Sequence, residues 1–152
     1  MADRSFGGPY VQVAAICAMP LIEQQGYLSV IRIQDRIQVA GVTDQMPPQP
    51  LSSLNLVLAL KSGEIRGKYS ILVSVTTPSG KTLPGPEIPM LFEGEERGVI
   101  TALPLGVVAD EEGLYWFEIT LEGTMLSRIP LRVMYQKVGM FPGMPFQPPK
   151  SD

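Results

Sequence analysis

Two short runs of alternating apolar and polar residues, joined by an acidic residue and a glycine, lie between Gly113 and Tyr135. One parity of these runs is apolar throughout and consists of Tyr115, Phe117, Ile119, Leu121, Ile129, Leu131 and Val133. Alternation with a period of two is typical of a β-strand that buries one face and exposes the other. The segment therefore predicts an antiparallel β-hairpin, and no other stretch of the chain restricts the fold as strongly.

The register of this hairpin follows from the requirement that its apolar residues share one face. A three-residue connection, Glu122–Thr124, sets Phe117 opposite Ile129. A two-residue turn would set Phe117 opposite Arg128, and a slip of one residue moves every side chain to the other face. We therefore expect the three-residue turn, and we expect an edge position for Pro130, which cannot donate to a strand ladder. The other expected pairs are Leu121 with Met125, Tyr115 with Leu131 and Glu118 with Arg128.

Similar but shorter patterns occur along the rest of the chain. We expect strands at 10–18, within 27–39, at 54–61, at 68–77, at 90–92 and at 99–107. The leucines and alanine of 54–61 are also compatible with a helix, but eight residues that end at a Ser-Gly pair favour a strand. Seven to eight short strands with a turn signal about every ten residues predict an all-β fold, an antiparallel two-sheet immunoglobulin-like sandwich.

Prolines and glycines divide the chain into its expected parts. The segment 44–53 contains three prolines and is expected to be a loop without hydrophobic anchors that crosses between sheets, and 84–89 is expected to be irregular. Residues 1–9 are expected to form a flexible leader and residues 10–135 the β-sandwich domain.

Residues 136–152 form a C-terminal tail that is rich in proline, methionine and phenylalanine. Disordered tails usually lack aromatic residues, so this composition indicates an interaction. Three alternatives remain open: the tail packs along its own domain, it docks on a partner as an extended polyproline-like segment, or it is inert. The candidate partner-binding residues are Met140, Phe141, Met144 and Phe146.

Composition argues against several functions. The chain has 152 residues, 45% of them apolar, which suits one domain. Its net charge of −3 and the lack of any basic run make nucleic acid an unexpected partner. It has no histidine, and histidine is the usual general base and the commonest metal ligand. Cys17 is the single cysteine, so no intrachain disulfide forms, and its apolar surroundings predict a small buried side chain.

Calcium binding, carbohydrate binding and catalysis are three alternatives to a protein-binding role. Calcium would need carboxylates that converge, yet the acidic residues Asp110, Glu111, Glu112, Glu93, Glu95 and Glu96 fall in two separate turns. Carbohydrate could stack on the exposed aromatics Trp116, Tyr27 and Tyr10. Catalysis would need a motif such as a glycine-flanked nucleophile or a phosphate-binding loop, and the sequence contains neither.

These observations predict a non-enzymatic protein-binding or structural module with no catalytic residues, no metal and no cofactor. A protein partner or self-association is expected, and a carbohydrate-binding module that uses exposed aromatics is the alternative. The N-terminus lacks the order of a signal peptide, and no apolar run is long enough to span a membrane. We therefore expect no membrane partner and a cytoplasmic location, which the unpaired cysteine also favours.

Two segments resemble a known family. The first is ICAMPLIEQQGYLSVIRIQDRI, in which a cysteine-bearing strand precedes a glycine, a short strand and a polar end. The second is GLYWFEITLEGTMLSRIPLRV, the closing hairpin with its acidic-glycine turn. Together they resemble bacterial proteins of a domain family of unknown function, over about residues 10–135. The resemblance implies an immunoglobulin-like sandwich and supplies no active residues.

Overall fold

The computed structural model describes residues 7–139, and these residues form strands and connections without a helix. The strands are β1 (Tyr10–Ile22), β2 (Leu28–Ile33), β3 (Arg36–Gly41), β4 (Gln49–Pro50), β5 (Asn55–Lys61), β6 (Arg66–Thr76), β7 (Thr82–Glu93), β8 (Gly98–Pro104), β9 (Val108–Ala109), β10 (Gly113–Leu121) and β11 (Thr124–Lys137). The all-β expectation is confirmed. In the described part of the chain no helix is long and apolar enough to cross a membrane.

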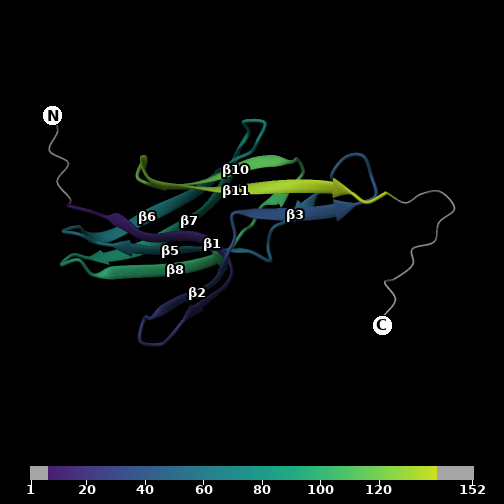
Figure 1. The fold of residues 1–152 in the computed structure, drawn as a ribbon. Helices are drawn as coiled ribbons and strands as arrows, with labels where there is room; N and C mark the ends of the chain where they lie inside the picture. Colours follow the sequence, from purple (N-terminus) through teal and green to yellow (C-terminus); the bar gives the residue numbers. More distant parts are fainter. Residues whose placement is uncertain (1–6, 140–152) are drawn as a thin grey trace, which may run out of the picture.

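The strands form three sheets. One has the order β2-β1-β5-β8, the second β3-β11-β10-β6-β7, and the third pairs β4 with β9. Figure 1 shows the two larger sheets as two layers, with β10 and β11 in the upper layer and β5 and β8 in the lower. The expectation of only antiparallel pairs was wrong, because β3 lies parallel to β11. The expected number of strands was also too low.

The hairpin expected from the sequence is present with its predicted pairs Phe117–Ile129, Tyr115–Leu131 and Glu118–Arg128. The predicted turn, however, is wrong. Leu121 pairs with Thr124, so the connection has two residues, and Glu122 and Gly123 both have positive φ, 46° and 84°. Such angles suit the two-residue turns whose twist matches that of the strands. A register shift between Ile119 and Thr120 then restores the apolar face, as a β-bulge does.

Prolines account for most of the other differences between the predicted and the observed strands. The segment expected to be irregular, 84–89, lies within the twelve-residue strand β7, which is an edge strand and so tolerates missing donors. β1 likewise continues through Pro20. β11 is not an edge strand, because it lies between β3 and β10, but Pro130 precedes the residues that pair with β3, so one side of the strand is unpaired there.

The segment 27–39 was expected to hold one strand, but it supplies two that belong to different sheets. β2 pairs with β1 in the four-stranded sheet, and β3 pairs with β11 in the five-stranded sheet. The two strands are separated at Gln34 and Asp35, just after Arg32, whose backbone has a φ of 58°. The proline-rich segment 44–53 then leads from β3 back to the four-stranded sheet, as expected, and includes the short strand β4.

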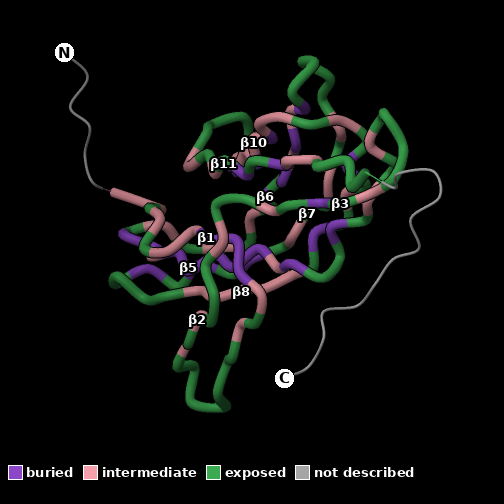
Figure 2. The backbone as a smooth tube through the Cα atoms, turned by 45° about the vertical axis from the view of Figure 1, so that its right-hand side comes forward, coloured by how far each residue is buried: buried purple, intermediate pink, exposed green. Residues whose placement is uncertain are grey.

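The core lies between the two larger sheets. β5 contributes Leu56, Leu58 and Leu60, β6 contributes Ile71, Val73 and Val75, and the β10–β11 hairpin contributes Tyr115, Phe117, Ile119, Leu121, Leu131 and Val133. Figure 2 shows these buried segments gathered at the centre, whereas the β1–β2 hairpin extends outside the body. The prediction of a strand at 54–61 is confirmed. Both faces of this strand are buried, since Val57 is buried as well as the leucines, and this explains why both of its faces are apolar.

Cys17 is fully buried in β1, and burial raises the pKa of its thiol. We expect native protein at pH 8 to react with a thiol-alkylating reagent about 100-fold more slowly than protein unfolded in urea, because only the exposed thiolate reacts. Mass spectrometry of quenched time points measures both rates. Equal rates in the two states would show that Cys17 is accessible and would contradict its burial.

Candidate functional site

The partner-binding residues expected from the sequence, Met140, Phe141, Met144 and Phe146, lie outside the described residues. The described chain leads to them at a defined place. The backbone N–H of Val138, just after β11, donates to the carbonyl of Gly41 at the end of β3, with an N–O distance of 2.7 Å. Lys137 also pairs with Asp44 there. The tail therefore begins beside the C-terminal end of β3.

The acidic turns have structural partners. Glu111 accepts a hydrogen bond from the backbone N–H of Ser79 at 2.6 Å, and Glu112 accepts one from that of Tyr135 at 2.7 Å. In the other turn, Glu93 and Glu95 pair with Arg97. Within residues 7–139 no group of three His, Cys, Asp or Glu residues could hold a metal. The two turns are thus occupied in stabilising the loops.

The candidate aromatics for carbohydrate are not brought together. The guanidinium of Arg128 lies 4.2 Å from the ring centroid of Trp116, on the outer face of the five-stranded sheet. The hydroxyl of Tyr10 donates to Glu96. Tyr27 follows the turn of the β1–β2 hairpin, is 67% exposed and lines a hollow of about 520 Å³ with Gln12, Gln25 and Lys61. Only Tyr27 therefore combines exposure with a concave, polar surrounding.

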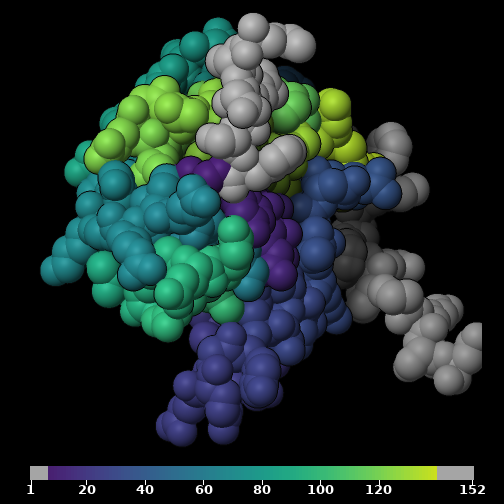
Figure 3. Space-filling view, turned by 90° about the vertical axis from the view of Figure 1, so that its left-hand side faces the viewer, coloured from purple at the N-terminus to yellow at the C-terminus, as the bar shows by residue number. Residues whose placement is uncertain are grey.

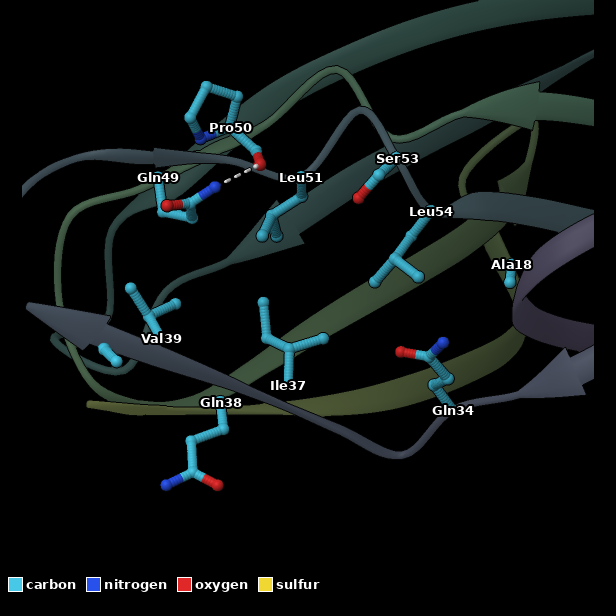
Figure 4. A pocket seen from close by; sticks show the side chains of 11 residues that line it. Ala18, Gln34, Ile37, Gln38, Val39, Gln49, Pro50, Leu51, Ser53 and Leu54 are labelled. Carbon is cyan, nitrogen blue, oxygen red and sulfur yellow. Dashed lines mark hydrogen bonds between the residues drawn. The ribbon is translucent and has the colours of Figure 1, made fainter. Parts of the chain in front are cut away.

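A different cavity is built by two segments whose sequences share no common pattern. A cleft of about 440 Å³ lies between β3 and the segment from Gln49 to Leu54, and Figure 4 shows the side chains that line it. Ile37 and Val39 point into it from β3, and Leu51 and Leu54 point into it from the opposite wall (Figure 4). Gln38, between the two β3 residues, points away. The backbone of β3 therefore forms part of the wall at that position.

Hydrogen bonds hold the opposite wall in place. The backbone N–H of Leu51 donates to Val107 at 2.9 Å, and that of Leu54 donates to Leu51 at 3.0 Å. The N–H of Leu105 in turn donates to the carbonyl of Leu54 at 2.9 Å. Leu51 is only 1% exposed, so the expectation that this segment lacks hydrophobic anchors was wrong. In the sequence, this anchor was indicated by the leucine that directly follows Pro50.

The cleft has an uncharged lining with a polar rim. Its residues are Ala18, Gln34, Ile37, Gln38, Val39, Ala40, Gln49, Pro50, Leu51, Ser53 and Leu54. The side chains of Gln34 and Ser53 have no hydrogen-bond partner within the described residues, whereas the Gln49 amide donates to Pro50. Among residues 7–139, β3 is an edge strand and pairs with β11 alone. The cleft thus combines apolar residues at its base, amide and hydroxyl groups at its rim and the free edge of a strand. This combination suits an extended uncharged peptide.

The β1–β2 hairpin presents a second apolar surface. Its outward residues Met19, Leu21, Ile31 and Ile33 are between 41% and 67% exposed, and their register places them on one face. Figure 3 shows the hairpin projecting from the body of the molecule. The sequence could not distinguish these exposed residues from core residues. Val30 and Leu28 on the other face of β2 are apolar as well, so apolar and polar residues do not alternate there.

The fold and the cleft define an all-β domain that carries an uncharged cleft beside an edge strand. The chain belongs to a family of unknown function, DUF6941, whose model matches residues 12–134. This match confirms the resemblance expected over about residues 10–135. No curated protein matches the chain.

Three solved structures share a distant likeness. A beta-glucosidase from Listeria innocua in complex with glucose is 14% identical with a TM-score of 0.44, covering 66% of this chain and 15% of its own. An immunoglobulin-like protein from Pseudomonas aeruginosa is 10% identical with a TM-score of 0.41, covering 83% and 96%. The alkylpurine DNA glycosylase AlkC of Pseudomonas fluorescens is 9% identical with a TM-score of 0.39, covering 80% and 30%. These similarities carry no argument about ligand or activity.

Proposed function

We propose that the chain is a non-enzymatic protein-binding module of immunoglobulin-like type, and that it binds an extended, uncharged segment of a partner protein in the cleft beside β3. The observation that carries the proposal is the cleft itself, whose base is formed by Ile37 and by the almost fully buried Val39, Leu51 and Leu54, and whose exposed lining consists mostly of uncharged polar groups. Edge strands bind extended peptides through main-chain hydrogen bonds, and flanking pockets select the side chains.

The size and polarity of the cleft define the ligand. A volume of about 440 Å³ accommodates two or three large apolar side chains and the backbone between them. Burial of each such side chain contributes about 1.5–3 kcal/mol, and the ordering of the peptide opposes it. An unpaired charge in the peptide would lose its hydration without gaining a partner, because the lining is uncharged. The expected ligand is therefore apolar, uncharged and extended.

A random linear peptide library, displayed on phage and selected on the full chain, tests this proposal. We expect enrichment of uncharged sequences with two or more large apolar residues. Ile37→Lys should weaken the binding of the selected peptides at least about tenfold, because it places a charge on the floor of the cleft. Ile31→Lys is the matched control, since Ile31 is an exposed isoleucine on the hairpin, and its affinity should equal that of the wild type.

Ile37 also packs against the core, so a second variant separates loss of binding from loss of folding. Ser53→Lys adds a charge at an exposed position whose side chain lies at the rim of the cleft. It should weaken binding while leaving the melting temperature unchanged. If the affinity of the selected peptides is unchanged by Ile37→Lys and Ser53→Lys but falls with Ile31→Lys, the binding surface is the β1–β2 hairpin instead.

A carbohydrate-binding module is the second candidate, and the observation that favours it is the hollow at the hairpin tip. Tyr27 offers an exposed ring there, and the side chains of Gln12, Gln25 and Lys61 supply hydrogen-bond donors. Exposed aromatic rings with nearby amides are suited to a sugar ring. We expect Tyr27→Ala to abolish any signal on a glycan array, whereas Trp116→Ala should leave it intact. An array on which the wild type binds nothing removes this candidate.

A further inference from the structure

We infer that the segment that fills the cleft is residues 140–146 of the same chain, so that the C-terminal tail blocks its own binding site. The inference rests on the proposed function, because it requires the cleft to accept an extended apolar segment. It goes further by naming the occupant and by making the occupied state self-inhibited.

Position is the first argument. The described chain ends at Gly139, directly after the hydrogen bond from Val138 to Gly41 at the end of β3. Ala40, the preceding residue of β3, lines the cleft. A chain that turns back at Gly139 enters the cleft at once and runs antiparallel to β3, because β11 is parallel to it. Seven extended residues span about 23 Å, which matches the roughly 20 Å of six-residue β3.

Composition is the second argument. Residues 140–149 contain no charged residue, and neither does the lining of the cleft. The segment carries four large apolar side chains, at Met140, Phe141, Met144 and Phe146, which is what a floor of isoleucine, valine and leucine accepts. Methionine also adapts its shape to irregular cavities. Charged residues return in the sequence only at Lys150, beyond the length that β3 can accompany.

The prolines determine how the segment binds. Pro142 and Pro145 lack an N–H, so the segment cannot form a continuous ladder with β3. A polyproline-like conformation instead exposes the carbonyl groups. The amide of Gln34 and the hydroxyl of Ser53 line the rim without a partner in the described part of the chain and supply donors for these carbonyls. The polar rim is thus matched to a proline-rich segment.

Tethering gives this arrangement a regulatory consequence. A short tether keeps the tail at an effective concentration on the order of millimolar. A partner peptide of similar affinity therefore competes poorly until the tail is displaced. Removal of the four apolar side chains of the tail should raise the apparent affinity of the cleft for an outside peptide at least about tenfold.

Hydrogen exchange on the full chain tests the inference. The test variant replaces Met140, Phe141, Met144 and Phe146 by serine, and the control variant replaces Gln147, Pro148, Pro149 and Lys150 by serine. Only the test variant should show faster exchange, by about tenfold or more, at the amides of β3 and of Leu51–Leu54, while β10 is unchanged. A synthetic peptide of residues 139–149, GMFPGMPFQPP, should restore the slow exchange of the test variant.

Each other outcome overturns a defined part of the inference. Equal exchange in the wild type and the test variant shows that the tail does not occupy the cleft. If library peptides still bind the test variant and Ser53→Lys weakens that binding, the proposed function stands without this inference. If no peptide binds either protein, both fail. If the slow exchange is lost when the protein is diluted, and sedimentation shows a doubled mass, the tail of a second copy occupies the cleft instead.

Discussion

Gly85→Ala is expected to lower the free energy of unfolding by about 2–3 kcal/mol, a large loss for a domain of this size. A β-carbon at Gly85 would lie 2.0 Å from the carbonyl oxygen of Val73 on the neighbouring strand β6. The obstructing atom belongs to the backbone, so it cannot rotate away as a side chain can. The pairing of β6 and β7 must separate locally to admit the methyl group, next to the irregularity already present between Leu72 and Ser74.

Gly106→Ala is the matched control, because a β-carbon there would have no atom within 4 Å. Urea unfolding followed by the fluorescence of Trp116 measures both variants. We expect Gly106→Ala to shift the midpoint little and Gly85→Ala to shift it strongly downward with a similar slope. Equal midpoints for the two variants would contradict the close approach of β7 to β6 at Gly85.

Tyr115→Ala should be the most destabilising of the core substitutions, at about 3–5 kcal/mol. Tyr115 is fully buried, and its hydroxyl donates to the carbonyl of Glu111 at 2.9 Å and accepts from the N–H of the same residue at 3.3 Å. Tyr115→Phe keeps the ring and removes only the hydroxyl. We expect it to cost about 1–2 kcal/mol, because two backbone groups of the Glu111 turn lose their partner.

The hydroxyl of Tyr115 also predicts a pH dependence. Burial raises the pKa of Tyr115 above its ordinary value of 10.0. A group with a raised pKa in the folded state stabilises that state below its unfolded pKa, and this stabilisation is lost as the pH rises through the folded value. The stability of the wild type should therefore fall above pH 10 more steeply than that of Tyr115→Phe. Parallel pH profiles in thermal unfolding would contradict the burial of this hydroxyl.

Local alternation was sufficient to predict the central hairpin. Tyr115, Phe117 and Ile119 are buried as the pattern required, because the two faces of a strand alternate with its residues. The same requirement gave the right pairs at Phe117 and Tyr115 but the wrong turn. A two-residue turn followed by a bulge gives the same register as a three-residue turn, so apolar matching cannot distinguish them.

The pairing of strands that lie far apart in the sequence could not be predicted from local patterns of apolar and polar residues. The parallel contact of β3 with β11 joins residues almost a hundred positions apart, and only the packed fold decides it. Pro84 and Pro89 argued against a strand because the edge position of β7 was unknown. The cleft arises for the same reason, since Ile37 and Leu51 belong to segments that carry no shared signal in the sequence.

The tail could be singled out by composition alone, but its binding site could not. The excess of methionine, phenylalanine and proline in residues 136–152 indicated an interaction segment. A site for it became definable once the end of β11 was located beside β3 and the uncharged cleft.

An NMR titration of methyl-labelled protein tests whether the cleft beside β3 binds an extended uncharged peptide. The protein is the variant with serine at residues 140, 141, 144 and 146, and the probe is the peptide GMFPGMPFQPP. We expect saturable chemical-shift changes confined to the methyl groups of Ile37, Val39, Leu51 and Leu54. Changes confined to the hairpin residues Ile31 and Ile33, or no saturable change at millimolar concentrations of either this peptide or the peptides selected from the library, would contradict it.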